Sequence, residues 1–551
     1  MVDTQQPAGA DPDPFANPDD AALPASMVWD AWGAPAGHKP LSPQIRGLLK
    51  QVFGVSGETV TRRDEGDVPL RDSALTPAAR AGLAAVVGAE HVSTDHRDRL
   101  LHAGGKSTPD LLRRRAEGPQ DAPDAVVFPG DHEQVVAVLG YCAEAGIAVV
   151  PFGGGTSVVG GLDPIRGEFA AVISLDLRRL NALIAVDPVS ATATFGAGVT
   201  GPRAEELLGA HDLSLGHFPQ SFEFASIGGF AATRSSGQAS AGYGRFDDMV
   251  QALRVATPTG TLELGRAPAS AAGPDLRELF VGSEGMLGII TEVTVRVHPV
   301  PETIAYQAWS FPDFETGAAA LRSLVQAGAA PTVLRLSDEM ETGVNLARTA
   351  DIGGEAVSGC LAITTFEGTE MHVAARGLEA GALLAAAGGT VLGEMPAREW
   401  ESGRFSAPYL RDSLLDAGVL CETLETATTW SNLSNLKAKV TAALTESLTG
   451  QGTPALVMCH ISHTYPTGAS LYFTVIAKLL DDPLAQWQAA KHAAGDAIVA
   501  AGGTITHHHA VGADHRRWIP DEIGDLGVRV LRAVKREIDP AGILNPGKLV
   551  P

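Results

Sequence analysis

The amino-acid sequence predicts a two-domain protein of the α+β class. The chain has 551 residues, which is several times the length of a typical domain. Short apolar runs alternate with helical runs from residue 122 onward, and the alternation starts again after Pro299 and Pro301. We therefore expect one domain at residues 122–301 and a second at residues 302–551. The composition, 45% hydrophobic and 19% charged, is that of a globular protein with a large core.

Two segments precede the first domain. Residues 1–26 are rich in aspartate and proline, so we expect a disordered tail. Residues 27–121 are expected to form a helical region, with helices at Pro43–Val52 and Thr76–Val87.

The first domain opens with a strand–helix–strand unit. We expect a strand at Ala125–Phe128, a helix at Asp131–Ala145 with an acidic N-cap, and a strand at Ile147–Phe152. The last strand runs directly into glycines, which is how an α/β unit presents backbone N–H groups to a ligand. Short strands follow at Ala171–Leu175, Leu183–Asp187, Thr192–Ala197, Leu253–Thr257, Thr261–Leu264 and Ile289–Val297. The second domain is expected to contain a helix at Phe311–Ala329, a strand at Thr332–Ser337, and elements at Leu361–Phe366, Ala374–Ala387 and Thr390–Gly393.

Charge and cysteine content restrict the class of protein. Lysine and arginine total 41 and aspartate and glutamate 64, so the net charge is −23. This excludes nucleic-acid binding through a basic surface and disfavours an electrostatic membrane anchor. The four cysteines form no CxxC pair, and no apolar run reaches the roughly 18 residues of a membrane span. With an acidic N-terminus and far more arginine than lysine, we expect a bacterial cytoplasmic protein with at most peripheral membrane contact.

Three clusters of glycine and hydroxyl residues carry the strongest functional signal. The first, Pro151-Phe-Gly-Gly-Gly-Thr-Ser157, follows a strand, and its glycines allow positive φ and free three N–H groups to face a pyrophosphate. It is not the GxGxxG of a Rossmann crossover, and by itself it is equally compatible with a plain glycine turn. The second cluster spans residues 220–237 and the third residues 281–292. Three such clusters in one domain indicate a long ligand wrapped by backbone donors.

These motifs resemble a known family. PFGGGTS, IGG followed by TRSSG, and GSEGMLGIITEVTVRVHPVPE together resemble the flavin domain of vanillyl-alcohol-oxidase-type (PCMH-type) FAD proteins. The rest of the chain resembles the alkyldihydroxyacetonephosphate synthase (alkylglycerone-phosphate synthase) family in WDAWG from Trp29, APYLRD from Ala407, ETLET from Glu422, SHTYPTGA from Ser462 and HHHAVG from His507. The resemblance covers nearly everything from Val28 onward. It implies a two-subdomain PCMH-type FAD-binding domain, then an α+β substrate (cap) domain with an antiparallel sheet and a C-terminal FAD-linked oxidase-type region.

The resemblance implies noncovalently bound FAD. In the family, the first glycine loop cradles the FAD pyrophosphate, and three further segments contact the cofactor. The matching positions are Pro151, Phe152, Gly153, Gly154, Gly155, Thr156, Ser157, Gln220, Ser221, Ser226, Gly228, Gly229, Thr233, Arg234, Ser235, Ser236, Glu284, Gly285, Gly288, Ile289 and Ile290. Gln220 departs from the pattern, since the family usually has aspartate there.

The resemblance also implies catalytic roles in the second half. Tyr465 matches the family's acid/base, and His507, His508 and His509 match an active-site histidine run. Because an unperturbed tyrosine has a pKa near 10, base chemistry at Tyr465 needs cationic neighbours, which we expect the histidines to provide. The alternatives are a core tyrosine, a solvated polar turn and an opportunistic metal site. Successive loop side chains point in different directions, and no acidic partner follows at ligand spacing. We therefore expect no metal and assign the histidines to proton transfer.

Three further residues are expected to bind substrate. Arg411 matches the residue thought to hold the substrate phosphate, and its guanidinium offers the bidentate fork that suits an oxyanion. The alternative for Arg411 is a surface ion pair with Asp412. Arg335 and His217 match other family positions linked to activity.

The reaction implied by the resemblance is a transfer in ether lipid synthesis. The acyl group of acyl-dihydroxyacetone phosphate is exchanged for a fatty alcohol, with FAD serving without net redox. A base removes a C1 proton, flavin N5 forms a covalent adduct with the substrate, the fatty acid leaves and the alcohol attacks. The partners are therefore lipid substrates, and the family tendency implies a homodimer.

Two rival functions stay open. The C-terminal run Asp539–Lys548 resembles the ending of FAD-linked 2-hydroxy-acid dehydrogenases, so the alternative is an FAD-linked oxidoreductase of a 2-hydroxy acid or another alcohol. Against it, HHHAVG is not the histidine-and-acid metal pattern associated with those dehydrogenases. A flavin-binding protein without catalysis is the other alternative, and the joint presence of Arg411, Tyr465 and the histidines argues against it.

Overall fold

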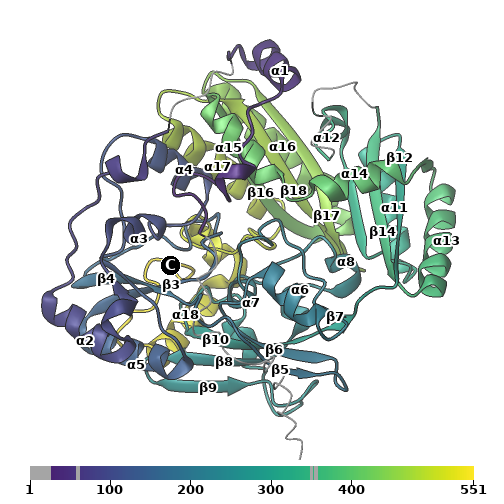
Figure 1. Ribbon diagram of the computed structural model, residues 1–551. Coiled ribbons are helices and arrows are strands. Elements are labelled where there is room, and N and C mark those ends of the chain that lie inside the picture. The colour runs from purple at the N-terminus through teal and green to yellow at the C-terminus, as the bar shows by residue number, and fades with distance from the viewer. Residues whose placement is uncertain (1–25, 57–61, 348–351, 353–357) are drawn as a thin grey trace, which may run out of the picture.

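The structure is a computed structural model that describes residues 26–56, 62–347, 352 and 358–551. All of the expected tail except Ser26 lies outside the described residues. Figure 1 shows two smaller sheets in the first half of the chain and one large sheet in the second half. The predicted α+β class is confirmed, and so is the antiparallel sheet of the second half.

The first sheet contains the strand–helix–strand unit expected from the sequence. Its parallel strands are joined by α5 (His132–Ala145), which begins where the Asp131 side chain accepts from the Gln134 N–H and ends at Gly146 with φ of 64°. Helix α2 (Pro77–Val87) packs on α5. The strand order is β1 (Val92–Ser93), β2 (Ala125–Val127), β4 (Ala171–Asp176) and β3 (Ile147–Phe152), with β1 antiparallel to β2.

The second sheet is antiparallel and lies below the first in Figure 1. A small ribbon of β7 (Leu213–Ser214) and β11 (His298–Pro299) flanks it. The strand order is β5 (Leu183–Asp187), β6 (Thr192–Gly196), β10 (Ile289–Arg296), β8 (Val250–Thr257) and β9 (Gly260–Leu264). Its helices are α6 (Gly201–Gly209), α7 (Ile227–Ala232), α8 (Ser240–Tyr243), α9 (Phe246–Met249) and α10 (Arg277–Phe280).

The second half forms a seven-stranded antiparallel sheet. The expected helix from Phe311 starts later, because Phe311 ends a strand and Asp313 caps the helix by accepting from the Thr316 N–H. The strand order is β15 (Thr390–Gly393), β12 (Thr303–Phe311), β14 (Cys360–Gly368), β13 (Val333–Ser337), β17 (Ala455–Thr464), β18 (Gly468–Lys478) and β16 (Val419–Thr429). The helices are α11 (Phe314–Gln326), α12 (Glu339–Gly343), α13 (Glu370–Ala386), α14 (Met395–Gly403), α15 (Ala407–Asp416), α16 (Leu433–Gly450) and α17 (Pro483–Ala500).

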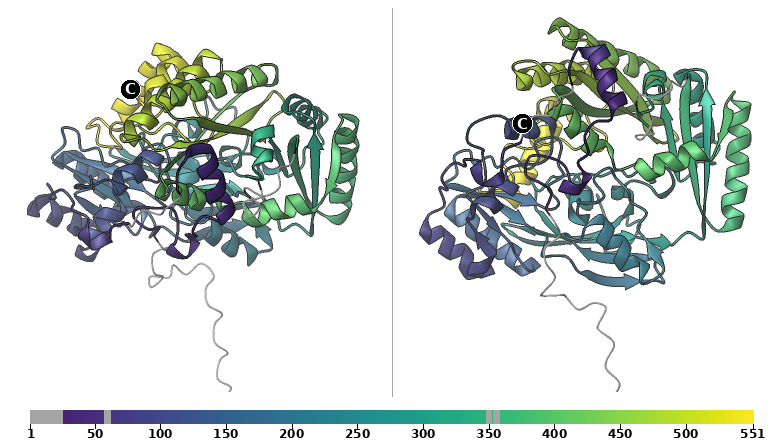
Figure 2. Two further views of the ribbon diagram at one scale, coloured as in Figure 1. Left: turned by 90° about the horizontal axis from the view of Figure 1, so that it is seen from above. Right: turned by 45° about the horizontal axis from the view of Figure 1, so that its top comes forward.

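Both ends of the described chain cross to the opposite half. Near the N-terminus, α1 (Pro43–Phe53) packs its apolar face on α15 and β16. Figure 2 shows the ribbon of α1 beside the second half of the chain. Two short helices, α3 (His96–Leu101) and α4 (Thr108–Arg115), follow on the first half, and α4 contacts α17. At the other end, α18 (Ile519–Ile538) and the residues after it return to the first half, where the Asn545 N–H donates to the Val149 carbonyl at 2.8 Å. None of the described helices is long and apolar enough to cross a membrane.

Candidate active site

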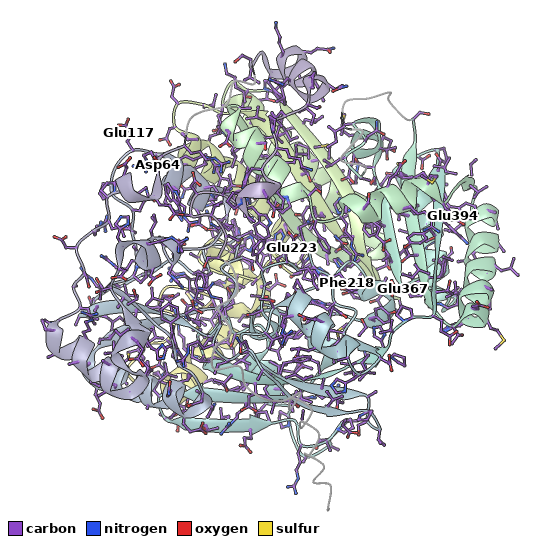
Figure 3. The ribbon with its side chains drawn as sticks, viewed as in Figure 1. Asp64, Glu117, Phe218, Glu223, Glu367 and Glu394 are labelled. Carbon is purple, nitrogen blue, oxygen red and sulfur yellow. The ribbon has the colours of Figure 1, made fainter. Side chains whose placement is uncertain are left out.

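The expected cofactor loops pack tightly against one another. A Cβ placed on Gly154 would lie 1.8 Å from the carbonyl oxygen of Phe224, and one on Gly153 would lie 2.3 Å from Oγ of Ser226. Neither position has room for a side chain, and at Gly154 the first glycine loop contacts the backbone of the 220–226 segment. That segment lies in the middle of the molecule, between the smaller sheets and the large one, where Figure 3 labels Phe218 and Glu223.

The third and fourth segments join the same assembly. Gly285 has φ of +74°, and a Cβ there would meet the Pro151 ring at 2.3 Å. A Cβ on Gly282, with φ of +81°, would meet the Arg234 side chain at 2.9 Å. The structure therefore brings all four predicted cofactor segments together, although they are up to 139 residues apart (Pro151 to Ile290).

Several polar atoms in these segments fit a cofactor with many acceptors. Nε2 of Gln220 and Oγ of Ser236 are enclosed, and neither has a hydrogen-bond partner among the described residues. Buried polar groups are normally paired, so these donors indicate a missing acceptor. Together with the side-chain-free glycine backbone, they fit an FAD diphosphate and ring system.

The other predicted cofactor residues have structural contacts of their own. The Thr233 hydroxyl donates to the Gly229 carbonyl, and Oγ of Ser226 caps α7 by accepting from the Gly229 N–H. Arg234 pairs with Asp247 and Glu278 instead of facing an open site. The remaining hydroxyl, glycine and apolar positions lie on the same segments: Phe152, Gly155, Thr156, Ser157, Ser221, Gly228, Ser235, Gly288, Ile289 and Ile290.

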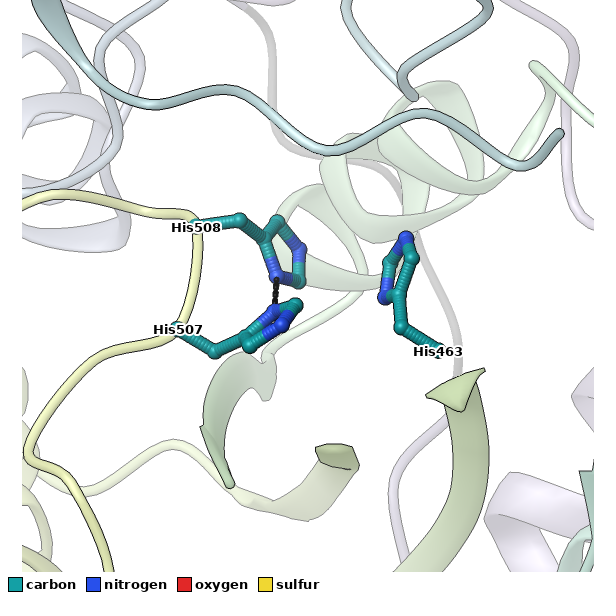
Figure 4. Close-up of side chains that lie close together, drawn as sticks. All are labelled: His463, His507 and His508. Atoms are coloured by element: carbon teal, nitrogen blue, oxygen red, sulfur yellow. Dashed lines mark hydrogen bonds between the residues drawn. The ribbon is translucent and has the colours of Figure 1, made fainter. Parts of the chain in front are cut away.

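The predicted catalytic residues form a buried cluster. The hydroxyl of Tyr465 lies 2.6 Å from Nε2 of His507, and Nδ1 of His507 lies 3.0 Å from Nδ1 of His508. Figure 4 shows His463, from the end of β17, facing these two rings. One tautomer of His507 satisfies both contacts: Nε2 accepts from the tyrosine, and Nδ1–H donates to His508.

The electrostatics of this cluster differ from the sequence-based expectation of cationic histidines. Burial lowers the pKa of His508 to about 3 and holds the pKa values of His507 and His463 well below the ordinary value. Burial also raises the pKa of Tyr465 to about 12, although the nearby Arg245 guanidinium acts in the opposite direction. At neutral pH, the site therefore holds a neutral tyrosine against neutral imidazoles, which is a pair able to pass a proton.

A three-nitrogen site is geometrically present in the same cluster. The ring nitrogens of His463, His507 and His508 all lie within 4.8 Å of one another. His509 lies outside this group and packs edge-on to Tyr472, with ring centroids 5.6 Å apart. The expected absence of a metal stays a prediction, and metal analysis of the purified protein tests it.

Two buried carboxylates anchor the loop that carries the histidines. At its start, Glu425 of β16 accepts from the backbone N–H groups of His507, His508 and His509. At its end, Glu284 accepts from the N–H groups of Val511 at 2.9 Å and Gly512 at 2.8 Å. The loop is thus fixed to the large sheet at one end and to the third glycine cluster at the other.

Burial raises the pKa of Glu284 to about 7 from 4.5, which predicts a pH-dependent stability. The folded protein binds this proton more tightly than the unfolded chain does. The contribution is therefore complete below about pH 4.5 and lost as the pH rises through 7, by about 3 kcal/mol. We expect Glu284→Gln, which does not titrate, to remove this component. Thermal unfolding of both proteins at pH 5 and pH 7.5 measures it: the free energy of unfolding of the wild type, relative to that of the variant, should be lower at pH 7.5 than at pH 5. The same relative free energy at both pH values would contradict the prediction.

The predicted substrate residues occupy three different surroundings. His217 is fully buried against Phe230 and Phe246, and its Nε2 lies 3.0 Å from Oγ of Ser235. His217 is close to the cluster, because Ser235 lies in the same loop as Gly237. The Gly237 carbonyl bonds Nε2 of His463 at 3.1 Å.

Arg335 is linked to the histidine cluster through two other side chains, His460 and Tyr472. Its guanidinium pairs with His460 and with the buried carboxylate of Glu341. The His460 ring stacks on Tyr472 at 4.9 Å, and Tyr472 stacks on His508 at 6.0 Å.

Arg411 is buried instead of exposed. Its Nε and Nη2 donate to Oδ1 of Asp412, and its Nη1 donates to the Lys106 carbonyl. The ammonium of Lys106 is itself buried, where it donates to the carbonyls of Val28 and Trp29. The ion pair with Asp412 is therefore real but internal, and among the described residues Arg411 makes no hydrogen bond or ion pair with the histidine cluster.

Three functional candidates were not singled out from the sequence. His463 and Glu425 both lie in quoted motifs, SHTYPTGA and ETLET, but nothing in the sequence ties either to the histidine run. Arg245 directly follows the Tyr243-Gly244 pair and gave no motif signal at all.

Comparison with known proteins agrees with this architecture. Residues 123–265 match the FAD binding domain family, and residues 300–549 match the family of FAD linked oxidases, C-terminal domain. The chain is 35% identical over 537 residues to the alkyldihydroxyacetonephosphate synthase of Dictyostelium discoideum, covering 92% of this chain and 88% of the relative. A solved alkyldihydroxyacetonephosphate synthase structure superposes with a TM-score of 0.80 at 31% identity, covering 95% of this chain and 98% of that one.

A more distant relative is named as a dehydrogenase, which is a redox enzyme. The mitochondrial D-lactate dehydrogenase [cytochrome] of Arabidopsis thaliana is 28% identical over 475 residues, covering 84% of this chain and 78% of the relative. Identity and coverage are both higher for the synthase. The protein therefore belongs to the alkyldihydroxyacetonephosphate synthase-like family of FAD-linked oxidases, with an FAD-binding domain followed by an FAD-linked oxidase C-terminal domain.

Proposed function

We propose that the protein is an FAD-dependent transferase that exchanges the acyl group of acyl-dihydroxyacetone phosphate for a fatty alcohol. The observation that carries the proposal is the buried Tyr465–His507 pair, 2.6 Å apart, on a loop anchored to the cofactor-binding half by Glu284. A tyrosine and a neutral imidazole in contact form an acid/base pair.

The described residues fit bound FAD and supply its surroundings. The glycine backbone of residues 151–157 would hold the diphosphate, and the unpaired Gln220 and Ser236 side chains offer donors. When bound, FAD supplies an electrophilic ring system that takes up and returns an electron pair, so that the exchange needs no net oxidation.

Tyr465 and His507 would handle the substrate proton. The C1 proton of the substrate passes to Oη of Tyr465, while the hydroxyl proton of Tyr465 passes to Nε2 of His507. The C1–O bond to the acyl group breaks and releases a fatty acid, and a C1–O bond to the alcohol forms. The proton held at His507 then returns through Tyr465 to C1, and the hydroxyl proton of the alcohol leaves with the carboxylate as the fatty acid. Each turnover thus consumes one alcohol and releases one acid, without a change in oxidation state.

Arg411 would bind the substrate phosphate. Its guanidinium is buried in a low-dielectric region, where Nη1 donates to the backbone carbonyl of Lys106. Such a site attracts a phosphate over a short range, although the whole chain carries −23 charges. Asp412 holds the guanidinium in place from one side.

Anaerobic mixing of the purified flavoprotein with substrate tests the proposal. With acyl-dihydroxyacetone phosphate and a fatty alcohol, we expect release of fatty acid, formation of the ether product and no lasting loss of the oxidised flavin absorbance. A panel of 2-hydroxy acids serves as the comparison. Lasting bleaching of the flavin by a hydroxy acid, with no acid released from the lipid, would establish the dehydrogenase alternative instead.

A further inference from the structure

A single carboxylate organises the start of the histidine loop. The side chain of Glu425 is fully buried, with 0% exposure. Its Oε2 accepts from the His507 N–H at 2.5 Å, and its Oε1 accepts from the N–H groups of His508 at 3.2 Å and His509 at 2.8 Å. The Thr506 hydroxyl adds a fourth donor at 2.7 Å.

This arrangement fixes the directions of the rings. Buried backbone N–H groups need acceptors, and here three consecutive ones share the same carboxylate. The turn that this forces on the backbone sends the His507 ring to Tyr465 and the His508 ring to His507. Without the shared acceptor, the three amides would face an apolar interior, and the loop would need another conformation to satisfy them.

The charge of Glu425 also lies close to the rings. Its carboxylate oxygens are 3.7 Å from Nδ1 of His508 and 3.7 Å from Nδ1 of His509. Burial lowers the pKa values of these imidazoles, and the carboxylate opposes that effect. The other titratable or charged groups that interact with these histidines or with Glu425 are His460, His463, Tyr465, Tyr472, Lys491, His515 and Arg245.

We propose that Glu425 is the positioning residue of this site: it fixes the histidine loop so that His507 meets Tyr465, and its buried charge balances the proton that His507 takes up. This assignment rests on the proposed acyl-for-alkoxy exchange. The negative charge is present before the reaction, so a cation formed on the imidazole is stabilised without any rearrangement of the surroundings.

Glu425→Gln tests the assignment, with Glu422→Gln as its matched control. Glutamine keeps the size of the side chain but removes the charge and directs N–H groups at the backbone donors. Glu422 lies on the same strand, and its carboxylate accepts from Trp487 Nε1, outside the histidine loop. We expect Glu425→Gln to lower kcat by about 10- to 100-fold. KM should change less than threefold, flavin content should be kept, and the acidic limb of the kcat profile should move to lower pH. Glu422→Gln should match the wild type.

Ring-nitrogen NMR of labelled histidines gives a readout that does not depend on the reaction. We expect Glu425→Gln to shift the ring nitrogens of His507, His508 and His509, and Glu425→Asp, which keeps the charge, to restore part of the activity. Unchanged shifts together with a kcat within twofold of wild type would overturn the assignment. Equal losses for the aspartate and glutamine variants would show a purely steric role and also overturn it. If the wild type shows no exchange activity, the proposed function fails, but the NMR comparison still decides whether Glu425 controls the histidines.

Discussion

Replacing Tyr465 by phenylalanine is expected to reduce the rate of acyl exchange by about 1,000-fold, in the middle of the range for losing a general acid/base. The hydroxyl is the part of the side chain that touches Nε2 of His507, at 2.6 Å. Phenylalanine keeps the ring and its packing, so FAD binding and thermal stability should stay close to wild type. Single-turnover release of fatty acid, measured beside the flavin absorbance spectrum, gives the result.

Tyr306→Phe is the matched control for this prediction. Tyr306 is also a buried tyrosine whose pKa burial raises to about 12, and its hydroxyl donates to Glu401 at 2.5 Å in the same half of the chain. It lies on β12, with no described contact to the histidine cluster. A Tyr465→Phe protein that turns over normally would remove this hydroxyl from the mechanism. Equal losses in both variants would point to stability instead of chemistry.

Replacing Gly154 by alanine is expected to weaken FAD binding by about 10- to 100-fold or more, because overpacking on this scale costs about 1–3 kcal/mol. The added Cβ would lie 1.8 Å from the carbonyl oxygen of Phe224. Backbone atoms oppose it, so either the glycine loop or the 220–226 segment must move, and both are expected to contact the cofactor. Titration of the apoprotein with FAD, followed by flavin fluorescence, measures the change.

Gly140→Ala provides the comparison. Gly140 lies inside α5 of the same half, and nothing lies within 4 Å of its Cβ position. Alanine in a helix interior is favoured over glycine by about 1 kcal/mol, so this variant should bind FAD normally and unfold at a higher temperature. Normal FAD affinity in Gly154→Ala would show that the first glycine loop does not form the cofactor site.

Local sequence patterns predict the fold best where a single strand or helix carries its own sequence signal. Ile147–Phe152 and Leu183–Asp187 are strands with the expected bounds, since each is a short β-rich run ended by glycine or a turn. The long strands β16, β17 and β18 were not predicted. Their buried faces carry glutamate, histidine and serine, such as Glu425, His463 and Ser470, and these residues hide the apolar alternation that marks a strand.

In the candidate site too, features that depend on local sequence were predictable, whereas contacts between distant residues were not. The glycine loops are visible in the sequence, because backbone that must approach a ligand closely needs glycine at fixed positions. The Tyr465–His507 contact was expected only from family resemblance, since 42 residues separate the two. The contacts of Glu425 with a loop more than 80 residues away arise from tertiary packing alone, and no local pattern announces them.

In the proposed function, the anchoring of the histidine loop at both ends links cofactor binding to catalysis. Glu425 belongs to the large sheet, whereas Glu284 belongs to a segment that is expected to contact FAD. Because Glu284 bonds Val511 and Gly512, a displacement of the cofactor segment would move the end of the loop that carries His507. The loop therefore connects the two halves, and in the proposed mechanism the alignment of Tyr465 with His507 depends on the position of the cofactor segment.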